Sequence, residues 1–461
     1  MNYCLHTVLK KEFHMVEPNI ANTNTEKPLS GLLSRAPERA ILIGVDRPGA
    51  DWSLEESLDE MEQLATTAGI RCIDRVTQHL DHPHPGTLLG TGKVQEIADL
   101  VRFHNCDAVL FDLELSPRQH RNLERDLETQ VIDRTALILI IFGQRARTKE
   151  GRLQVELAQI EYDLPRLARQ WAHLSRQKGS VQQRGEGEKQ IEVDRRLLRR
   201  QKDALEEELE KVRTHRQLHR ERRKSAGVPV VALVGYTNAG KSTLLNALAG
   251  TVVLAEDKLF ATLDPTTRRI RLAGGQEFLL TDTVGFVQRL PPTLVAAFRA
   301  TLEEVAEADL LVHVVDASSL SMPHQVEAVE QVLEEIGASD LPVIVARNKT
   351  DLLASDARLA LPGASAALPA IRISALTGSG IDELLRCISE QLVRRFAALD
   401  VLIPYERGDL VALLHQYGTL EYEGYEEGGT RLRGHIPANH SGPFAPFATR
   451  SAASKWKRLR A

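Results

Sequence analysis

The feature that most constrains the fold of this 461-residue chain is one glycine-rich loop. It reads Gly235-Tyr236-Thr237-Asn238-Ala239-Gly240-Lys241-Ser242 and matches the phosphate-binding pattern G-x-x-x-x-G-K-[ST]. The apolar run PVVALV precedes the loop, and the helix-forming run STLLNALAG overlaps its end. Backbone N–H groups of such a loop surround nucleotide phosphates at a helix N-terminus. The context predicts an α/β domain that binds a nucleoside triphosphate.

Side chains in and near this loop predict a phosphate contact and a magnesium site. In the pattern, Lys241 neutralises the β- and γ-phosphates, and the hydroxyl of Ser242, which precedes Thr243, is a ligand of Mg²⁺. A second motif, Asp282-Thr283-Val284-Gly285, ends the predicted strand EFLLTD. There Asp282 can hold Mg²⁺ through water, and the Gly285 N–H can reach the γ-phosphate. We therefore expect Lys241 and Gly285 to act in catalysis.

Two further motifs predict guanine as the base. Asn348-Lys349-Thr350-Asp351 follows the predicted strand LPVIVAR, and Ser374-Ala375 ends the strand IRIS. The Asp351 carboxylate can accept hydrogen bonds from N1–H and the exocyclic amino group of guanine, a pattern that adenine does not offer, and the Ser374-Ala375 main chain can support the same base. The order of the motifs resembles that in small GTPases of the translation-factor class. GTP and GDP are therefore the expected ligands.

A first switch segment, residues 260–264, should contact GTP and supply a threonine to the same Mg²⁺. The segment reads Phe260-Ala261-Thr262-Leu263-Asp264, followed by PTT. Spacing alone leaves Thr262, Thr266 and Thr267 open, because each of them could also be an ordinary turn hydroxyl.

Phe286 follows Gly285, where many GTPases carry the glutamine that orients the attacking water. Its ring has no hydrogen-bond donor or acceptor and can simply pack beneath the second switch. Asn238 occupies the position from which cation-dependent relatives help to hold K⁺, although an asparagine there can also stabilise the loop. A bound partner that orders the switches is the other way to position the water.

Composition indicates a globular protein with no membrane insertion. Apolar residues make up 43% of the chain and charged residues 26%, and no apolar run approaches the roughly 20 residues that cross a bilayer. The 4 cysteines are scattered, as expected of free thiols in a reducing cytoplasm. The net charge of −5 hides a block with excess Lys and Arg, residues 145–224, which favours contact with a polyanion.

Strand and helix patterns alternate over residues 40–143 and again over 229–396, which predicts two α/β units with mostly parallel sheets. The run TALILIIF should be a strand or another buried segment. Between the units, apolar residues recur at helical spacing in two segments, which predict an antiparallel helical hairpin with a bend at Pro165.

The exposed basic residues of the hairpin have two interpretations. Arg195, Arg196, Arg199 and Arg200 could contact RNA phosphates or belong to a solvated helix that serves as a spacer. The stretch 86–93 (GTLLGTGK) looks like a phosphate loop, but its spacing is wrong and valine follows its lysine. A tight turn before a helix is expected there.

The chain as a whole resembles the HflX family of the Obg–HflX group of GTPases. The resemblance is carried by IDRTALILIIFGQRARTKEGRLQVELAQIEYDLPRL, RGEGEKQIEVDRRLLRR, KLFATLDPTTR and DTVGFVQRLP, and it covers roughly residues 40 to 440. It implies a multidomain α/β fold, and among the three threonines the family pattern selects Thr262, which should then act in catalysis with Lys241 and Gly285. The implied parts are a leader at 1–37, an N-terminal α/β domain at 38–143, the helical hairpin at 144–226, the P-loop GTPase domain at 227–396, and a small C-terminal α/β domain with its tail at 397–461.

The same resemblance implies a function. The protein is expected to be a monomeric, cytoplasmic GTPase that binds the large ribosomal subunit and its rRNA, with peripheral membrane contact left open. It should dissociate stalled or idle ribosomes, with hydrolysis stimulated by the ribosome, Mg²⁺ as cofactor and K⁺ as a second candidate. The alternative is a GTP-gated factor for RNA binding or ribosome assembly that does not split ribosomes. The hairpin loop 179–188 (GSVQQRGEGE) departs from the family pattern GGIGTRGPGE at Ser180, Gln182 and Glu186, which bears on the rRNA contact.

Overall fold

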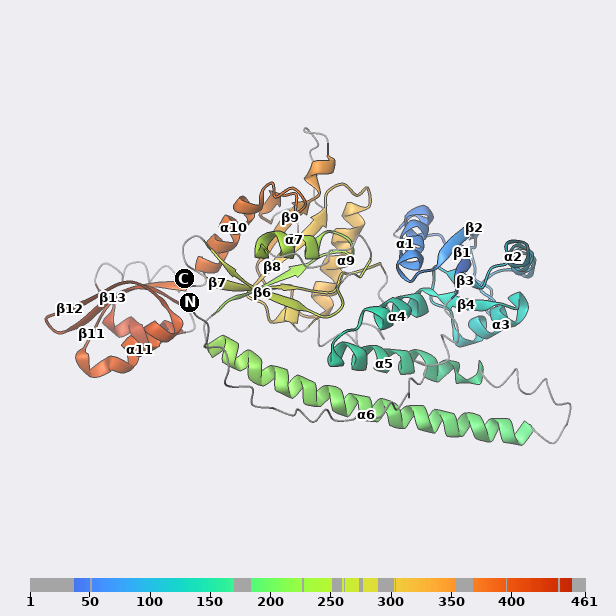
Figure 1. Ribbon diagram of the computed structural model, residues 1–461, viewed down its shortest axis with the longest axis horizontal. Coiled ribbons are helices and arrows are strands. Elements are labelled where there is room, and N and C mark those ends of the chain that lie inside the picture. The colour runs from blue at the N-terminus through green and yellow to red at the C-terminus, as the bar shows by residue number, and fades with distance from the viewer. Residues whose placement is uncertain are drawn as a thin grey trace, which may run out of the picture. The chain divides into compact units, whose positions relative to one another are not determined.

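The computed structural model combines an N-terminal α/β domain, a helical middle region, a P-loop domain and a small antiparallel sheet (Figure 1). This architecture confirms the fold class expected from the sequence. Residues 1–36 of the leader, the hairpin residues 170–183, Ala261 and the basic C-terminal tail lie outside the residues that the structure describes. The described residues are 37–49, 52–169, 184–225, 228–250, 259–260, 262–272, 277–288, 302, 304–353, 368–394, 396–437 and 440–449.

The N-terminal domain is built on a four-stranded sheet in the order β2-β1-β3-β4, in which all neighbouring strands are parallel. Strands of parallel sheets are buried on both faces, which explains the unbroken apolar run AVLF of β3. The elements are β1 (Arg39–Asp46), α1 (Leu54–Thr67), β2 (Arg71–His79), α2 (Thr91–His104), β3 (Ala108–Phe111), α3 (Pro117–Leu127), β4 (Gln130–Asp133) and α4 (Arg134–Arg145).

The strand interpretation of the run TALILIIF is wrong, because the run forms most of helix α4. Residues 134–142 of this helix are all buried. The Asp133 carboxylate starts the helix by accepting a hydrogen bond of 2.9 Å from the Ala136 N–H. An apolar run without a polar face fits a buried strand and a buried helix equally well, so periodicity could not decide between them.

The stretch 86–93 is a tight turn before a helix, as expected. His84 and Leu88 exchange two backbone hydrogen bonds of 2.9 Å, and α2 begins at Thr91. Lys93 lies in the first turn of α2 and forms an ion pair with Glu96 at 2.8 Å.

The middle region contains two helices that run antiparallel, which confirms the expected hairpin. The first, α5 (Lys149–Asp163), ends where a 3₁₀ helix (Leu164–Arg169) that contains Pro165 begins, so the expected disruption at this proline is also confirmed. The second, α6 (Arg184–Ser225), has 42 residues. Ion pairs join the two helices, and residues late in α5 pair with residues early in α6. The pairs are Glu161–Lys202 at 2.7 Å, Glu150–Arg216 at 2.8 Å and Lys149–Glu208 at 3.0 Å.

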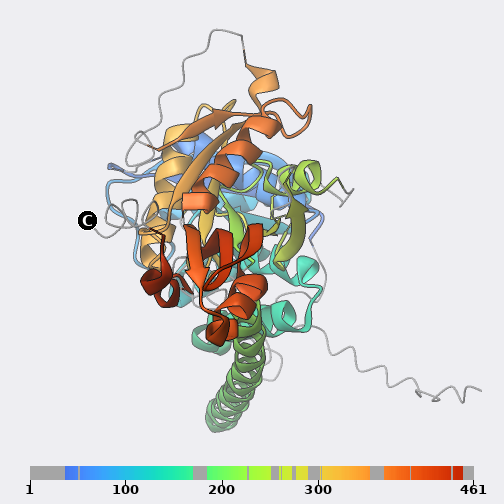
Figure 2. The ribbon, with the colours of Figure 1, turned by 90° about the vertical axis from the view of Figure 1, so that its left-hand side faces the viewer.

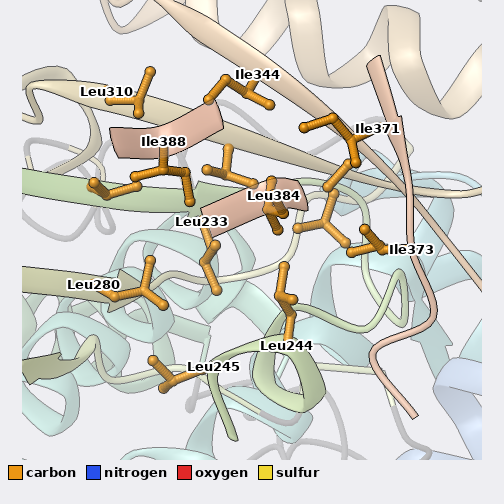
Figure 3. Packing of buried hydrophobic residues seen from close by; sticks show 14 of the residues in the cluster. Leu233, Leu244, Leu245, Leu280, Leu310, Ile344, Ile371, Ile373, Leu384 and Ile388 are labelled. Atoms are coloured by element: carbon orange, nitrogen blue, oxygen red, sulfur yellow. The ribbon is translucent and has the colours of Figure 1, made fainter. Parts of the chain in front are cut away.

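The P-loop domain is a six-stranded sheet in the order β10-β9-β8-β5-β7-β6, in which only β6 pairs antiparallel. Apolar side chains of the sheet, α7 and α10 pack together in its core (Figure 3). The carboxyl ends of the parallel strands lie at one edge of the sheet, where ligands of such folds bind. The elements are β5 (Val230–Val234), α7 (Lys241–Ala249), β6 (Thr266–Arg271), β7 (Glu277–Asp282), β8 (Leu310–Asp316), α9 (Met322–Glu335), β9 (Val343–Asn348), β10 (Ala370–Arg372) and α10 (Ile381–Arg394).

The C-terminal unit has the order strand, helix, strand and strand, and it is drawn in red in Figure 2. Its sheet is antiparallel in the order β11-β13-β12. Among the described helices of the whole chain, none is long and apolar enough to cross a membrane. The elements of this unit are β11 (Phe396–Ile403), α11 (Gly408–Tyr417), β12 (Thr419–Glu426) and β13 (Gly429–Pro437).

Candidate nucleotide-binding site

The P-loop, residues 235–242, joins β5 to α7 as the motif predicts. Three of its residues have a positive φ, a backbone conformation that favours glycine: Gly235 at 152°, Asn238 at 58° and Gly240 at 94°. A Cβ atom on Gly240 would collide with the Asn348 side chain, so glycine is required there. Asparagine adopts this conformation more readily than most residues, which gives Asn238 a role in the shape of the loop.

Lys241 is buried beneath the P-loop. Its ammonium donates hydrogen bonds to the carbonyl oxygens of Gly235 at 3.0 Å and Tyr236 at 2.8 Å. Burial lowers the pKa of Lys241 to about 8, although the nearby Asp282 carboxylate opposes this shift. Burial also lowers the pKa of His313 on β8 to about 4, with a smaller contribution from Lys241. A buried ammonium at this position can neutralise phosphate oxygens.

Ser242, Thr262 and Asp282 form a closed triangle of oxygen atoms. Both hydroxyls donate to Asp282 Oδ2, from Ser242 at 2.7 Å and from Thr262 at 2.8 Å, and the two hydroxyl oxygens lie 2.8 Å apart. Asp282 Oδ1 is buried and has no hydrogen-bond partner within the described parts of the chain. Burial raises the pKa of Asp282, and a bound cation would favour its charged form. This set of oxygen ligands fits Mg²⁺.

The position of Thr262 in the triangle separates it from the other two threonines. Thr266 and Thr267 lie in β6, and the Thr267 hydroxyl is hydrogen-bonded across the sheet to that of Thr281 at 3.0 Å. The geometry therefore favours Thr262 as the switch threonine, as the family pattern does.

The motif at 282–285 lies against the P-loop. The Phe286 N–H donates to Gly235 O at 3.1 Å, and the Thr237 N–H donates to Phe286 O at 2.7 Å. A Cβ atom on Gly285 would lie 2.8 Å from Thr237 Cα and 2.9 Å from Lys241 Nζ, so only glycine allows this approach.

The residues around Gly285 are buried. The Thr283 hydroxyl donates to Leu233 O at 2.6 Å, and Val284 is buried beside it in the chain. Phe286 belongs to a buried apolar cluster that includes Leu302 and Val305, in agreement with the packing interpretation of its ring.

Asn348 holds together the predicted guanine corner, which consists of residues 348–351 and 374–375. Its amide donates to Ala239 O in the P-loop at 2.8 Å and accepts from the Ala375 N–H at 2.9 Å. Asp351, two residues beyond the left-handed Lys349, has an exposed side chain. The corner therefore joins the P-loop, the end of β9 and the loop after β10.

The other side chains of this corner make local contacts. The Lys349 ammonium pairs with Asp316 at 2.7 Å, the Thr350 hydroxyl donates to Ile373 O at 2.8 Å, and the Ser374 hydroxyl accepts from the Thr377 N–H at 3.2 Å.

The switch segment around Thr262 contacts the N-terminal domain and the start of the middle region. The buried Phe260 ring meets Phe142 of α4 edge-on, with ring centroids 4.6 Å apart. Leu263 is buried. The Asp264 carboxylate, predicted to lie near the nucleotide, accepts hydrogen bonds at the start of α5 instead of from the P-loop.

Comparisons with known proteins agree with these motifs. Residues 55–143 match the family model "GTP-binding GTPase N-terminal", 145–223 match "GTP-binding GTPase Middle Region", and 230–349 match "50S ribosome-binding GTPase". The GTPase HflX of Lacrimispora saccharolytica is 45% identical over 406 residues, which cover 88% of this chain and 95% of that protein. The chain belongs to the HflX family of GTPases. The GTPase HflX of Escherichia coli is 47% identical over 396 residues, which cover 86% of this chain and 92% of that protein.

Sequence reasoning missed a buried polar network through which the N-terminal domain of this HflX-family GTPase reaches the P-loop. The Tyr236 hydroxyl donates to Glu60 of α1 and accepts from the Gln288 N–H at 2.6 Å. Glu60 is paired with Arg134, which also donates to Asp112 at 2.5 Å. Burial raises the pKa of Glu60 and of Tyr236. No local pattern could have indicated these contacts, because Tyr236 and Glu60 are separated by 176 positions.

Proposed function

We propose that this GTPase binds Mg²⁺ and GTP between the P-loop and the two switch segments, docks on the large ribosomal subunit in the GTP-bound state, and dissociates stalled or idle ribosomes. The nucleotide part is carried by the closed triangle of Ser242, Thr262 and Asp282. The ribosome part is supported by the family description of residues 230–349 and by the exposed arginines of α6.

In this proposal, residues 235–243 surround the phosphates with backbone N–H groups, and Lys241 neutralises the β- and γ-phosphates. The Gly285 N–H donates to the γ-phosphate. Because Gly285 has no Cβ atom, nothing at this position blocks the approach of the Lys241 ammonium to the phosphate. Mg²⁺, held by Ser242 and Thr262 directly and by Asp282 through water, would neutralise charge that develops on the phosphates.

Guanine recognition is assigned to the corner around Asn348. The exposed Asp351 carboxylate accepts from N1–H and the exocyclic amino group of the base. Asn348 positions this corner, since its amide holds Ala239 and Ala375 at once. The main chain of Ser374 and Ala375 contacts the base from the other side.

Positioning of the attacking water requires help from outside the second switch. The Phe286 ring is buried and has no polar atom, so it cannot orient water. A K⁺ ion near Asn238 and a docked ribosome that orders the switches are the two candidate sources of help. We therefore propose slow hydrolysis by the protein alone and strong stimulation by the ribosome.

The α6 helix is the proposed rRNA-binding arm. Arg196, Arg199 and Arg200 are exposed on it, whereas Arg195 pairs with Glu192 at 3.6 Å. Exposed arginines contact the sugar-phosphate backbone with little sequence preference and with strong salt dependence. A ribosomal partner places the protein in the cytoplasm, where it would act as a monomer.

Sedimentation through sucrose gradients tests this proposal. The full chain is mixed with 50S subunits or 70S particles in the presence of GTP, a non-hydrolysable GTP analogue or GDP. The protein should co-sediment with 50S subunits when the analogue is bound and should convert 70S particles to subunits. Stable binding without loss of 70S particles would instead support the assembly-factor alternative. No binding in any nucleotide state would refute the ribosome part.

Paired charge reversals on α6 supply a matched control. Arg199→Glu with Arg200→Glu should weaken co-sedimentation, because phosphate contacts are lost and repulsion is added. Lys211→Glu changes a charge of the same sign on the same helix, at a residue that pairs with Glu207 at 2.8 Å. This control should bind with near wild-type affinity.

A further inference from the structure

Phe260 and Asp264, on either side of Thr262, are held by the N-terminal domain and by the start of the middle region, respectively. Before Thr262, the Phe260 ring is buried against Phe142 near the end of α4. After it, the Asp264 carboxylate reaches the start of α5. Thr262 is therefore bracketed by two anchors that do not belong to the P-loop domain.

The Asp264 anchor is a set of hydrogen bonds at a helix N-terminus. The carboxylate accepts from the backbone N–H groups of Arg147 and Thr148, each at 2.9 Å, and from the Thr148 hydroxyl. Thr148 is itself the N-cap of α5, and its hydroxyl accepts from the Gly151 N–H at 3.0 Å. A negative charge at a helix N-terminus is favourable, and hydrogen bonds to a charged group are stronger than neutral ones.

Gly151 gives a second, independent observation. It lies buried in the first turn of α5, and a Cβ atom at this position would overlap Asp264 Oδ1 and lie 3.3 Å from Asp264 Cγ. Glycine is a poor residue for a helix compared with alanine. The first turn of the helix therefore carries a glycine where the carboxylate of the switch segment approaches it.

We propose that Asp264 is a positioning residue for GTP hydrolysis, and that the junction of α4 and α5 at residues 146–151 holds it so that Thr262 meets Ser242 and Asp282. Asp264 lies two residues from Thr262, and an extended chain spans only roughly 7 Å over two residues. Release of the carboxylate from α5 therefore frees Thr262 from its place in the triangle.

The inference rests on the proposed role of Thr262 at the magnesium site, and it makes the start of the middle region part of the hydrolytic assembly. It also connects the switch segment to the arm, because α5 is joined to α6 by the ion pairs of Lys149 and Glu150. Binding of GTP and the placement of α5 should then stabilise each other, since coupling of this kind is reciprocal.

The test uses the full chain with Asp264→Asn and, separately, Gly151→Ala. Asparagine keeps the shape of the side chain and removes its charge, whereas alanine improves the helix and displaces the carboxylate. Ser116→Ala is the matched control, because it removes an N-cap hydroxyl from α3 without touching the switch segment. Thr262→Ala is the reference for loss of the magnesium contact.

Three quantities are measured: affinity for a fluorescent non-hydrolysable GTP analogue, affinity for fluorescent GDP, and the Mg²⁺ concentration that gives half-maximal hydrolysis. Asp264→Asn and Gly151→Ala should weaken analogue binding and raise the Mg²⁺ requirement by roughly tenfold, the effect of losing one or two charge-assisted hydrogen bonds. GDP affinity should stay within about twofold of the wild-type value, because GDP has no γ-phosphate for the switch segment to contact. Ser116→Ala should change none of the three.

The outcomes separate this inference from the proposed site. If Thr262→Ala raises the Mg²⁺ requirement but neither Asp264→Asn nor Gly151→Ala does, the positioning role of Asp264 is overturned and the proposed site stands. If Thr262→Ala is also neutral, both are overturned. An equal loss of GDP and analogue affinity in Asp264→Asn and Gly151→Ala would show general damage to the fold and would overturn the positioning role.

Discussion

Replacing Arg134 by methionine should destabilise the protein more than any exposed arginine substitution. Arg134 is 2% exposed and forms ion pairs with Glu60 and Asp112, which are 8% and 3% exposed. Methionine fills similar space but leaves two carboxylates buried without their cation. Breaking a buried ion pair by removing one partner costs about 3–5 kcal/mol of unfolding free energy.

The unfolding free energy lost in Arg134→Met should depend on pH, and the direction follows from the pKa of Glu60. Burial is the main cause that raises the pKa of Glu60, and attraction by Arg134 is the largest opposing cause. Without Arg134, the folded-state pKa of Glu60 rises further above its unfolded value. Folding then favours the protonated form of Glu60. The unfolding free energy that this preference contributes is full below the unfolded-state pKa of Glu60 and is lost as the pH rises through its folded-state pKa. The deficit of Arg134→Met should therefore be largest near about pH 8 and should shrink as the pH is lowered towards about 5.5.

Urea unfolding of the full chain at both pH values measures this deficit. Arg102→Met is the control, because Arg102 pairs with Asp99 on the surface of α2 and both side chains are 62% exposed. An exposed pair contributes about 0–1 kcal/mol, so the control should be nearly neutral. Equal losses in the two variants, or a deficit in Arg134→Met that grows as the pH falls, would refute the reasoning.

Three further predictions concern the site and the hairpin. Because burial lowers the pKa of Lys241 to about 8, GDP binding should take up protons at about pH 8.5 and almost none at about pH 7. Calorimetry in buffers of different ionisation enthalpy measures this proton uptake, and Lys241→Met should remove it. Gly285→Ala should reduce hydrolysis at least roughly tenfold while GDP binding persists, because the new methyl group would meet Thr237 and Lys241; unchanged turnover would contradict the close approach. Lys202→Met should lower the unfolding free energy by less than about 1 kcal/mol, since its pair with Glu161 is part-exposed, and a larger loss in urea titrations would contradict this.

The nucleotide motifs could be predicted because each is a short, contiguous stretch of sequence that specifies the backbone of one loop. The P-loop, the motif at 282–285 and the corner at Asn348 each follow a strand, and parallel strands bring their carboxyl ends to one edge. Glycine at Gly240 and Gly285 marks positions where a neighbouring atom leaves no room for a side chain. Such positions can be recognised from the sequence without knowledge of distant contacts.

The contacts that the N-terminal domain and the middle region make with the switch segment and the P-loop could not be predicted. Asp264 and Thr148 are separated by 116 positions, and an aspartate before a proline has an ordinary interpretation as a turn residue. Glu60 appears in the sequence as one acidic residue of an amphipathic helix. Only the folded chain shows that it is buried and meets Tyr236.

The central claim is that a guanine nucleotide binds with its phosphates at Lys241 and its base at Asp351. Calorimetry of the full chain and of Asp351→Asn with GDP, ADP and xanthosine diphosphate tests it most directly, because xanthine has a carbonyl oxygen where guanine has the amino group. The account predicts that the wild type prefers GDP to ADP by roughly a hundredfold or more, and that Asp351→Asn loses GDP binding and gains binding of xanthosine diphosphate. Equal affinity of the wild type for GDP and ADP, or undiminished GDP binding by Asp351→Asn, would contradict it.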